Sequence, residues 1–379
     1  MKGTITRRGK SSWRLKYDIG RDAKGNRQIR YQTVRGKRQD AERELNKLLN
    51  SFHEGTSVDP SKVTVAEYMR GHLDRSTVSP KTLERYRQLA EQQIIPHLGT
   101  HVLQKLRPAQ IQEWHTTLLQ RGGKNGKPLS ARTVGHAHRV LHGALEIATA
   151  TEVVGRNVAS SIHPPKVEDV EVEILSAPEI TETLKKVRDT EWETIVAVDI
   201  GTGLRRGELV GLQWGDFDLD AAKMKVQRSV EETKQGLRLK TPKTKYGRRT
   251  LSLAPSTVEV LRAHLKKQRE TRIALGMGRE TPATMVFSTP EGQLLSPDNL
   301  SRDWKRVVKA RQLPAVTFHA LRHTHASALI ASGLDVVKIS RRLGHSSPKV
   351  TLTIYAHLFE KSDHAAATAI EATLRAGEP

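Results

Sequence analysis

The chain has 379 residues, which is long for one ordinary domain and suggests two or three. It carries 63 lysines and arginines against 41 acidic residues, and a formal net charge of +22 favours a polyanionic partner such as nucleic acid. The lack of cysteine excludes disulfide bonds, thiolate metal sites and a cysteine nucleophile. Neither a signal-peptide core nor an apolar run of bilayer length is present, so we expect a soluble, cytoplasmic protein with no membrane partner.

The first 58 residues predict a three-stranded sheet backed by one helix. Apolar and polar side chains alternate in residues 13–17 and again in residues 28–33, the period of half-buried strands. A helical apolar pattern follows in residues 41–52. We expect an outward face of Arg, Lys and Gln, which fits a DNA major groove or is simply solvated, and the pattern alone does not decide between the two. The candidate DNA-binding residues there are Arg14, Lys16 and Arg30.

Residues 62–162 show only helical signals and predict a bundle of about four helices. Ser79 followed by Pro80, Pro108, and Ser130 mark three helix starts. In the last of these helices, Arg132 and Arg139 lie off the apolar stripe, where such residues are most often solvated. We note both as candidate DNA-binding residues that need outside support.

A Pro-Pro step and alternating charges in residues 163–174 indicate an extended linker. From residue 175 to residue 379 the chain mixes helices with short strands near 222–253. The expected fold class is therefore multidomain and mainly α. It comprises a small N-terminal sheet-plus-helix domain, a helical bundle and a mixed α+β C-terminal domain.

Four segments of the last two hundred residues carry residue types suited to chemistry. Each is weak alone, because glycines beside an arginine also cap helices, basic hairpin turns are usually solvated, and a lone tyrosine usually packs in a core. The second segment is flanked by leucines that alternate along two strands, which predicts a hairpin turn. The segments are GTGLRRGEL at 201–209, TPKTKYGRR at 241–249, HALRHTH at 319–325, and LGH at 343–345 with a tyrosine at 355.

Two histidines of the third segment raise a zinc-site alternative. His319 and His323 have the i,i+4 spacing of a zinc-binding pair on a helix. The glutamate of the HExxH motif is missing, since position 320 is alanine, which argues against a zinc hydrolase. His319 and Arg322, three residues apart, are expected to project from one helix face.

Together the four segments supply what phosphodiester chemistry needs without a metal. Two arginines neutralise the charge on the non-bridging phosphate oxygens through charge-assisted hydrogen bonds. A tyrosine oxygen attacks phosphorus and later leaves as a phenolate, so the covalent intermediate is reversible. A lysine protonates the departing sugar oxygen, and histidines accept the phenolic proton or hydrogen-bond the phosphate.

Along the chain these residues occur in the order Arg, Lys, His-x-x-Arg, Gly-His and Tyr. In this order they resemble the tyrosine recombinases, specifically phage and conjugative-element integrases with an N-terminal arm-site domain. The resemblance covers essentially the whole chain and is strongest from 195 to 358. It rests on Thr202-Gly203-Leu204-Arg205, His319-x-x-Arg322, Leu343-Gly344-His345 and Tyr355.

The resemblance implies a role for each matching residue. Arg205 and Arg322 would clamp the scissile phosphate, and Glu208 would support the first arginine and the histidine. His345 would hydrogen-bond the phosphate, and Tyr355 would attack it to form a 3′-phosphotyrosyl intermediate. Lys243 would be the general acid, with Lys240 and Lys245 as alternatives, and His319 would assist as general base.

The resemblance also implies partners and domain roles. Residues 1–58 would bind arm sites, residues 62–162 the core site, and residues 175–379 would hold the catalytic centre and a C-terminal tail that packs on a neighbouring protomer. Four protomers would assemble on double-stranded DNA of a phage or mobile element, with no metal, ATP or other cofactor. A DNA-bending protein and a directionality factor are the accessory partners to consider. The alternatives are a type IB topoisomerase and a catalytically silent DNA-binding regulator.

Overall fold

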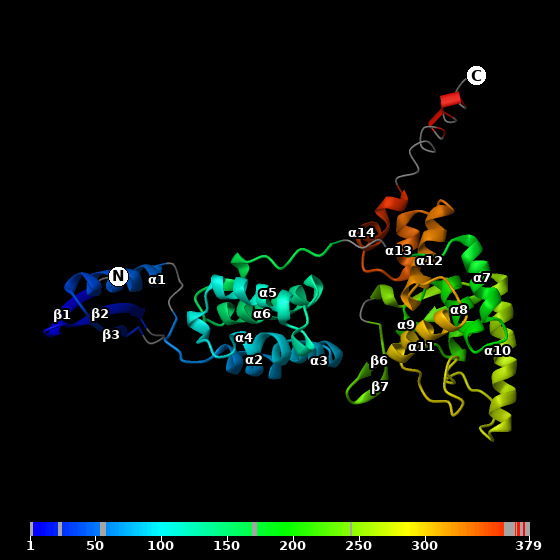
Figure 1. Ribbon diagram of the computed structural model, residues 1–379, viewed down its shortest axis with the longest axis horizontal. Helices are drawn as coiled ribbons and strands as arrows, with labels where there is room; N and C mark the ends of the chain where they lie inside the picture. Colours follow the sequence, from blue (N-terminus) through cyan, green and yellow to red (C-terminus); the bar gives the residue numbers. More distant parts are fainter. Residues whose placement is uncertain are drawn as a thin grey trace. The chain divides into compact units, whose positions relative to one another are not determined.

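The computed structural model describes residues 3–21, 25–53, 58–168, 173–242 and 245–359, together with residues 368, 370, 371, 374 and 375. The chain forms two units, residues 1–169 and residues 170–379. Figure 1 colours both along the sequence. Among the described residues, no helix is both long and apolar enough to cross a membrane.

The N-terminal part of the first unit is an antiparallel sheet covered on one face by a helix. The sheet has the order β1-β2-β3. Leu15 and Tyr17 of the central strand pack against Ala41 and Leu45 of the helix and form a small core. The elements are β1 (Gly3–Gly9), β2 (Ser12–Arg21), β3 (Arg27–Arg35) and α1 (Arg38–His53).

The expected outward face is wrong for β3. Lys16 pairs with Tyr31, so these two side chains share the face turned away from α1, and Tyr31 is 58% exposed. Arg30 instead pairs with the buried Tyr17 and points to the face that α1 covers, where it forms an ion pair with Asp59. Period-2 alternation marks two faces of a strand, but the strand register decides which face is covered.

The second part of the first unit is a helical bundle, and the predicted helix starts are confirmed. Pro80 and Pro108 are the first residues of their helices, and the Ser130 side chain accepts the Thr133 N–H at 3.3 Å as an N-cap. The core contains Ile94, Trp114, Leu141 and other apolar side chains. The helices are α2 (Val65–Asp74), α3 (Pro80–Leu89), the π-helical η1 (Ala90–Ile94), α4 (Ile95–Leu98), η2 (Leu103–Lys105), α5 (Pro108–Arg121), η3 (Lys124–Gly126), α6 (Ala131–Ala150) and η4 (Val158–Ser161).

The second unit is built around α8, which contacts α7, α10 and α12. Trp192, Trp304 and Phe318 join α8, α11 and α12 through ring centroids 5.6–6.4 Å apart. Helices α12, α13 and α14 contact one another, and Figure 1 shows them grouped at one end of the unit. The helices are α7 (Ala177–Val187), α8 (Trp192–Thr202), α9 (Arg206–Leu209), η5 (Trp214–Asp216), η6 (Lys245–Gly247), α10 (Pro255–Ala274), α11 (Pro297–Ala310), α12 (Phe318–Ala331), α13 (Val336–Leu343) and α14 (Pro348–Phe359).

The strands predicted near 222–253 are present, but segment 241–249 does not form the expected hairpin turn. The strand before it, β7, pairs with β6, whereas the strand after it, β8, pairs with β5. The segment therefore connects two different small sheets. The strands are β4 (Phe217–Asp218), β5 (Lys223–Val226), β6 (Ser229–Thr233), β7 (Gly236–Lys240) and β8 (Arg249–Ser252).

Candidate active site

Arg205 lies where a left-handed glycine ends α8 and the chain turns into α9. Gly203 has φ +63°, and a Cβ there would lie 2.5 Å from the ring of His325, so only glycine fits. The guanidinium of Arg205 donates to Glu208 Oε1 at 2.9 Å and to the carbonyl oxygen of Gly344 at 2.8 Å. These contacts connect the start of α9 to the end of α13 and fix the cation at that junction.

Glu208 is a buried carboxylate shared by two arginines. Its Oε2 accepts from the Arg205 backbone N–H at 3.1 Å and from Arg249 Nη2 at 2.9 Å. Burial alone would raise the pKa of Glu208, but the charges of Arg249 and Arg205 outweigh it and hold the pKa below its usual range. Glu208 is therefore ionised at neutral pH, and it orients both cations.

Arg322 projects from α12 into the same junction and is 3% exposed. It donates from Nη1 to the Gly203 carbonyl at 2.6 Å and from Nη2 to the Leu343 carbonyl at 2.8 Å. Burial, followed by the charge of Arg205, lowers the pKa of Arg322 to about 10. The group is still a cation at pH 7, and two arginines of like charge at one place form an anion site.

His345 lies just beyond the left-handed Gly344 that ends α13. It is 8% exposed, and its Nδ1 lies 2.8 Å from the hydroxyl of Thr351. Burial, then the charges of Arg322 and Arg205, lower the pKa of His345 to about 4. The ring is neutral at pH 7 and is held in one orientation by the threonine.

Tyr355 lies on α14 with its ring in a small apolar core that includes Ile330 and Leu343. Its hydroxyl is 2.6 Å from Nδ1 of His323, and the ring centroids are 5.6 Å apart. Burial raises the pKa of Tyr355 to about 12, although Arg322 acts in the opposite direction. In this geometry the tyrosine is protonated, and its hydroxyl is directed at a histidine.

His319 contacts His323 and makes no hydrogen bond to Tyr355. The two imidazole centroids are 4.8 Å apart in an edge-to-face arrangement. Burial of the ring, followed by the charges of His323 and Arg322, lowers the pKa of His319 to about 4, while the residue stays partly exposed to solvent. Within the described ranges, no group of three or more His, Asp or Glu side chains is arranged to hold a metal ion.

Of the three lysines in the β7–β8 region, one can be placed. Lys240 is ion-paired with the buried Glu231. The candidate general acid Lys243 lies outside the described residues, as does the side chain of Lys245.

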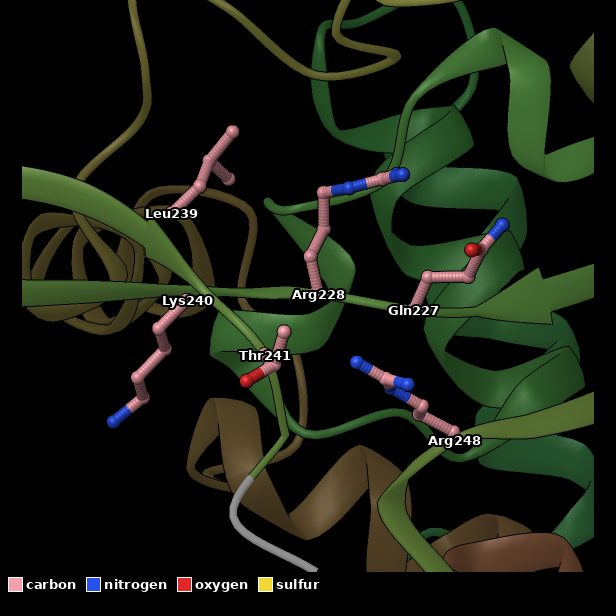
Figure 2. Close-up of a pocket in the computed structure, with 6 residues that line it drawn as sticks. All are labelled: Gln227, Arg228, Leu239, Lys240, Thr241 and Arg248. Carbon is pink, nitrogen blue, oxygen red and sulfur yellow. The ribbon is translucent and has the colours of Figure 1, made fainter. Parts of the chain in front are cut away.

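A pocket of about 420 Å³ borders this region, lined by Gln227, Arg228, Leu239, Lys240, Thr241 and Arg248. Arg228 is ion-paired with Asp216, whereas Arg248 has no partner among the described residues. Figure 2 shows the Arg248 side chain reaching into the space near Gln227 and Thr241. The pocket wall therefore presents a cation that has no acidic partner in the described ranges of the chain.

Four of the five candidate DNA-binding residues of the first unit lie on two exposed surfaces. Arg14 stacks over the ring of Tyr31, 5.6 Å from its centroid, on the sheet face that also carries Lys16. Arg132 and Arg139 are exposed on α6, and their charges contribute with that of Arg85 to lowering the pKa of His136, after burial. Neither arginine has an acidic partner in the parts of the chain that are described.

The sequence patterns did not indicate Arg249 or His323 as functional. Arg249 was one of several cations in a basic segment, and only its buried contact with Glu208, 41 residues away, separates it from Arg248. In the sequence, His323 is notable only as half of a possible zinc-binding pair with His319. Its position directly after Arg322 carries no signal, because the partner Tyr355 lies 32 residues further on.

Comparison with known proteins identifies the family. The model described as "Phage integrase family" matches residues 168–362, which is more than half of the chain. A second model, "Phage integrase, N-terminal SAM-like domain", matches residues 65–119.

The chain belongs to the phage integrase family.

Relatives and solved structures of this integrase family extend the match. A tyrosine recombinase XerC-like protein of Caldanaerobacter subterraneus subsp. tengcongensis is 28% identical over 382 residues, covering 95% of this chain and 96% of that protein. The Tn1549 transposon integrase in complex with transposon right end DNA has a TM-score of 0.67 at 22% identity, covering 81% of this chain and 99% of that one. A lambda integrase tetramer bound to a Holliday junction has a TM-score of 0.55 at 19% identity, covering 90% and 92%.

The two structural matches confirm the expected fold class, multidomain and mainly α with small sheets. The family match and the relative place this integrase among the tyrosine recombinases, a class of enzymes that cut and rejoin DNA strands.

Proposed function

We propose that this integrase performs site-specific recombination by attacking a DNA phosphate with Tyr355, which forms a 3′-phosphotyrosyl intermediate. One observation carries the proposal. Arg205, Arg322, His345 and Tyr355 come from four separate segments, yet Arg322 lies near each of the other three. The charge of Arg205 lowers the pKa of Arg322, and the charge of Arg322 lowers the pKa of His345 and acts against the raised pKa of Tyr355. Such convergence of cations, a neutral histidine and a tyrosine suits a phosphodiester under attack.

Arg205 and Arg322 supply charge stabilisation. Glu208 and the Gly344 carbonyl hold the guanidinium of Arg205. The carbonyls of Gly203 and Leu343 hold that of Arg322, so the arginines need no rearrangement when negative charge develops on the phosphate oxygens. Preorganised donors of this kind are typically worth about 3–4 kcal/mol each in a transition state. Glu208 acts through Arg205 as a positioning residue.

His345 and Lys243 complete the set of polar groups. When the Thr351 hydroxyl donates to Nδ1 of His345, the ring proton lies on Nε2, which then donates to a phosphate oxygen. Lys243 protonates the departing 5′ oxygen as the general acid. Support for Lys243 over Lys240 comes from the ion pair that already engages Lys240 with Glu231.

DNA contacts of the first unit follow from charge and exposure. The sheet face with Arg14 and Lys16 binds arm sites, and the exposed Arg132 and Arg139 of α6 contact the core site. Arg30 acts indirectly, because its ion pair with Asp59 and its place on the helix-covered face engage it within the protein. The lambda integrase tetramer bound to a Holliday junction supports a tetramer of this chain on DNA. A DNA-bending protein and a directionality factor are the accessory partners that we propose for it.

The experiment is a trapping assay on attachment-site DNA nicked so that cleavage releases a short strand and leaves the covalent adduct. Wild-type protein should form the adduct in EDTA, since the charge stabilisers are arginines. Tyr355→Phe should form none while it retains its DNA affinity, because one hydroxyl contributes little beside the phosphate contacts. An adduct in Tyr355→Phe, or a strict magnesium requirement for cleavage, contradicts the proposal. A two-site substrate then separates recombination from supercoil relaxation alone.

A further inference from the structure

His323 makes a contact that none of the roles above uses. Its Nδ1 lies 2.6 Å from the hydroxyl of Tyr355, which is the proposed nucleophile. The contact joins α12 to α14, two helices that pack directly on each other. His319, the residue that the family pattern suggests as general base, contacts the ring of His323 and makes no hydrogen bond to the tyrosine in the described part of the chain.

We propose that His323, rather than His319, accepts the phenolic proton when Tyr355 attacks the phosphate. The inference rests on the proposed function, because it assigns the base for that same nucleophile. A general base must lie within about 2.6–3.2 Å of the proton donor that it serves, and His323 meets this requirement.

The protonation states on the two sides of the contact suit a transfer in this direction. Burial and the charge of Arg322 lower the pKa of His323, so the ring is neutral at pH 7 and Nδ1 has a free lone pair. Burial raises the pKa of Tyr355 to about 12, so the phenol keeps its proton until phosphorus is attacked. The hydroxyl therefore donates and Nδ1 accepts, and the ring proton of His323 lies on Nε2.

The step balances without an added reactant. As the bond from Tyr355 Oη to phosphorus forms, the Oη–H bond breaks and its proton moves to Nδ1 of His323. The bond from phosphorus to the 5′ oxygen breaks, and that oxygen takes a proton from Lys243. In rejoining, a 5′ hydroxyl gives its proton back to Lys243 as it attacks the phosphotyrosine, and the leaving phenolate recovers its proton from His323.

The surroundings of His323 explain why the transfer waits for DNA. The groups that face it are His319 and Arg322 on α12, Tyr355 on α14 and His345 beyond α13. None of these four supplies a negative charge while the tyrosine is protonated, so an imidazolium is unfavourable in the free protein. A phosphodiester bound by the arginines brings the negative charge that stabilises it.

The test combines a substitution at residue 323 with a tyrosine of altered acidity at residue 355. In His323→Asn the amide oxygen still accepts a hydrogen bond but is too weakly basic to take the proton. We expect adduct formation at neutral pH to slow by roughly 10²–10⁴-fold, the usual worth of a general base. The rate should then rise about tenfold per pH unit, because the variant depends on ionisation of the tyrosine itself. The wild-type rate should be nearly flat above pH 7.

Difluorotyrosine at position 355, which ionises more easily than tyrosine, should restore most of the lost rate in His323→Asn. For each variant, the cleavage rate with difluorotyrosine at position 355 is divided by the rate with tyrosine there. A folding defect of the variant affects both rates and cancels in this ratio. His319→Asn is the matched control. Difluorotyrosine at position 355 should change the cleavage rate of His319→Asn by the same factor as it changes the wild-type rate. Rescue of His319→Asn with none for His323→Asn overturns the proposal.

Two further outcomes are decisive. His323→Asn that cleaves at or above the wild-type rate shows that the contact restrains the tyrosine, and this also overturns the role as base. An adduct that persists in Tyr355→Phe contradicts the proposed function itself. The two failures are therefore distinguishable.

Discussion

Arg249 donates a hydrogen bond from Nη2 to the buried carboxylate of Glu208 at 2.9 Å, and this contact joins strand β8 to the start of α9. The two side chains are only 7% and 4% exposed. Arg249 also donates from Nε to the carbonyl oxygen of Arg342 at 2.6 Å, at the end of α13. The pair therefore connects three segments that position Arg205, and the adjacent Arg248 takes no part in it.

This arrangement predicts opposite effects for two neighbouring arginines. Arg249→Ala removes a partner of a buried charge and should destabilise the protein by about 3–5 kcal/mol, the usual cost of breaking a buried ion pair. Arg248→Ala removes a cation that has no partner in the part of the chain that the structure describes, and it should change stability by less than about 0.5 kcal/mol. Arg248→Ala should weaken DNA binding. It should also reduce the salt slope, which is the slope of the logarithm of the DNA-binding constant against the logarithm of the salt concentration, by about 1, as expected for one lost phosphate contact. Urea denaturation and DNA-binding titrations over a salt series measure both, and equal loss of stability in the two variants would refute the distinction.

The general acid can be located with a DNA substrate that carries sulfur at the bridging 5′ position. Lys243→Ala should slow cleavage of ordinary DNA by roughly 10²–10⁴-fold. A thiolate leaves without a proton, so Lys243→Ala should cleave the sulfur substrate at nearly the wild-type rate, while Arg205→Ala and Arg322→Ala stay slow on both.

Two neighbouring lysines serve as controls for this assignment. Lys240→Ala removes a partner of the buried Glu231 and should lose stability, and the sulfur substrate should not correct its cleavage rate. Rescue of Lys245→Ala in place of Lys243→Ala moves the acid two residues along the chain, and rescue of none of the three places it elsewhere.

The strand register in the N-terminal sheet predicts that Lys16 and Arg30 differ in their effect on DNA. Lys16 lies on the open face beside Tyr31, so Lys16→Ala should weaken arm-site binding and reduce its salt slope. Arg30 is paired with Asp59 on the other face, so Arg30→Ala should leave the salt slope nearly unchanged. Competition binding of the full chain to arm-site and core-site DNA provides the measurement. A larger slope change for Arg30→Ala would restore Arg30 as a phosphate contact.

A buried histidine pair in the bundle predicts a loss of stability in mild acid. Nε2 of His115 lies 3.1 Å from Nδ1 of His138, and both rings are buried. Burial, then the charge of His115, lowers the pKa of His138 to about 4. The unfolded chain takes up this proton near pH 6.5 and the folded chain resists it until about pH 4. Stability is therefore complete above pH 6.5 and declines as the pH falls toward 4, by up to about 3 kcal/mol.

Thermal unfolding of the full chain between pH 4.5 and pH 7.5 measures this dependence. His138→Gln should flatten the part of the curve below pH 6.5. His136→Gln, an exposed position on the same helix, should flatten it less. Equal curves for wild type and His138→Gln would show that other groups control the acid transition.

Much of the molecule follows from local sequence. Proline and serine marked the starts of α3, α5 and α6, because these residues favour the first turn of a helix through their own backbone and side-chain geometry. The order of Arg205, Arg322, His345 and Tyr355 suggested phosphoryl chemistry, because the reaction demands those side-chain types and each lies in a short motif. Gly203 ends α8 in a left-handed conformation, which is the helix-cap role that glycines beside an arginine commonly take.

Tertiary structure decided the features that depend on partners distant in sequence. The alternation in residues 28–33 left the covered face of β3 undetermined, and pairing with β2 set Arg30 toward α1. The sequence around segment 241–249 predicted one hairpin, but its two flanking strands pair with different strands, β7 with β6 and β8 with β5. Arg249 and His323 became distinct from their neighbours only through Glu208 and Tyr355, across 41 and 32 residues. Sequence periodicity records which side chains are apolar, whereas the choice of partner depends on how the folded elements pack together.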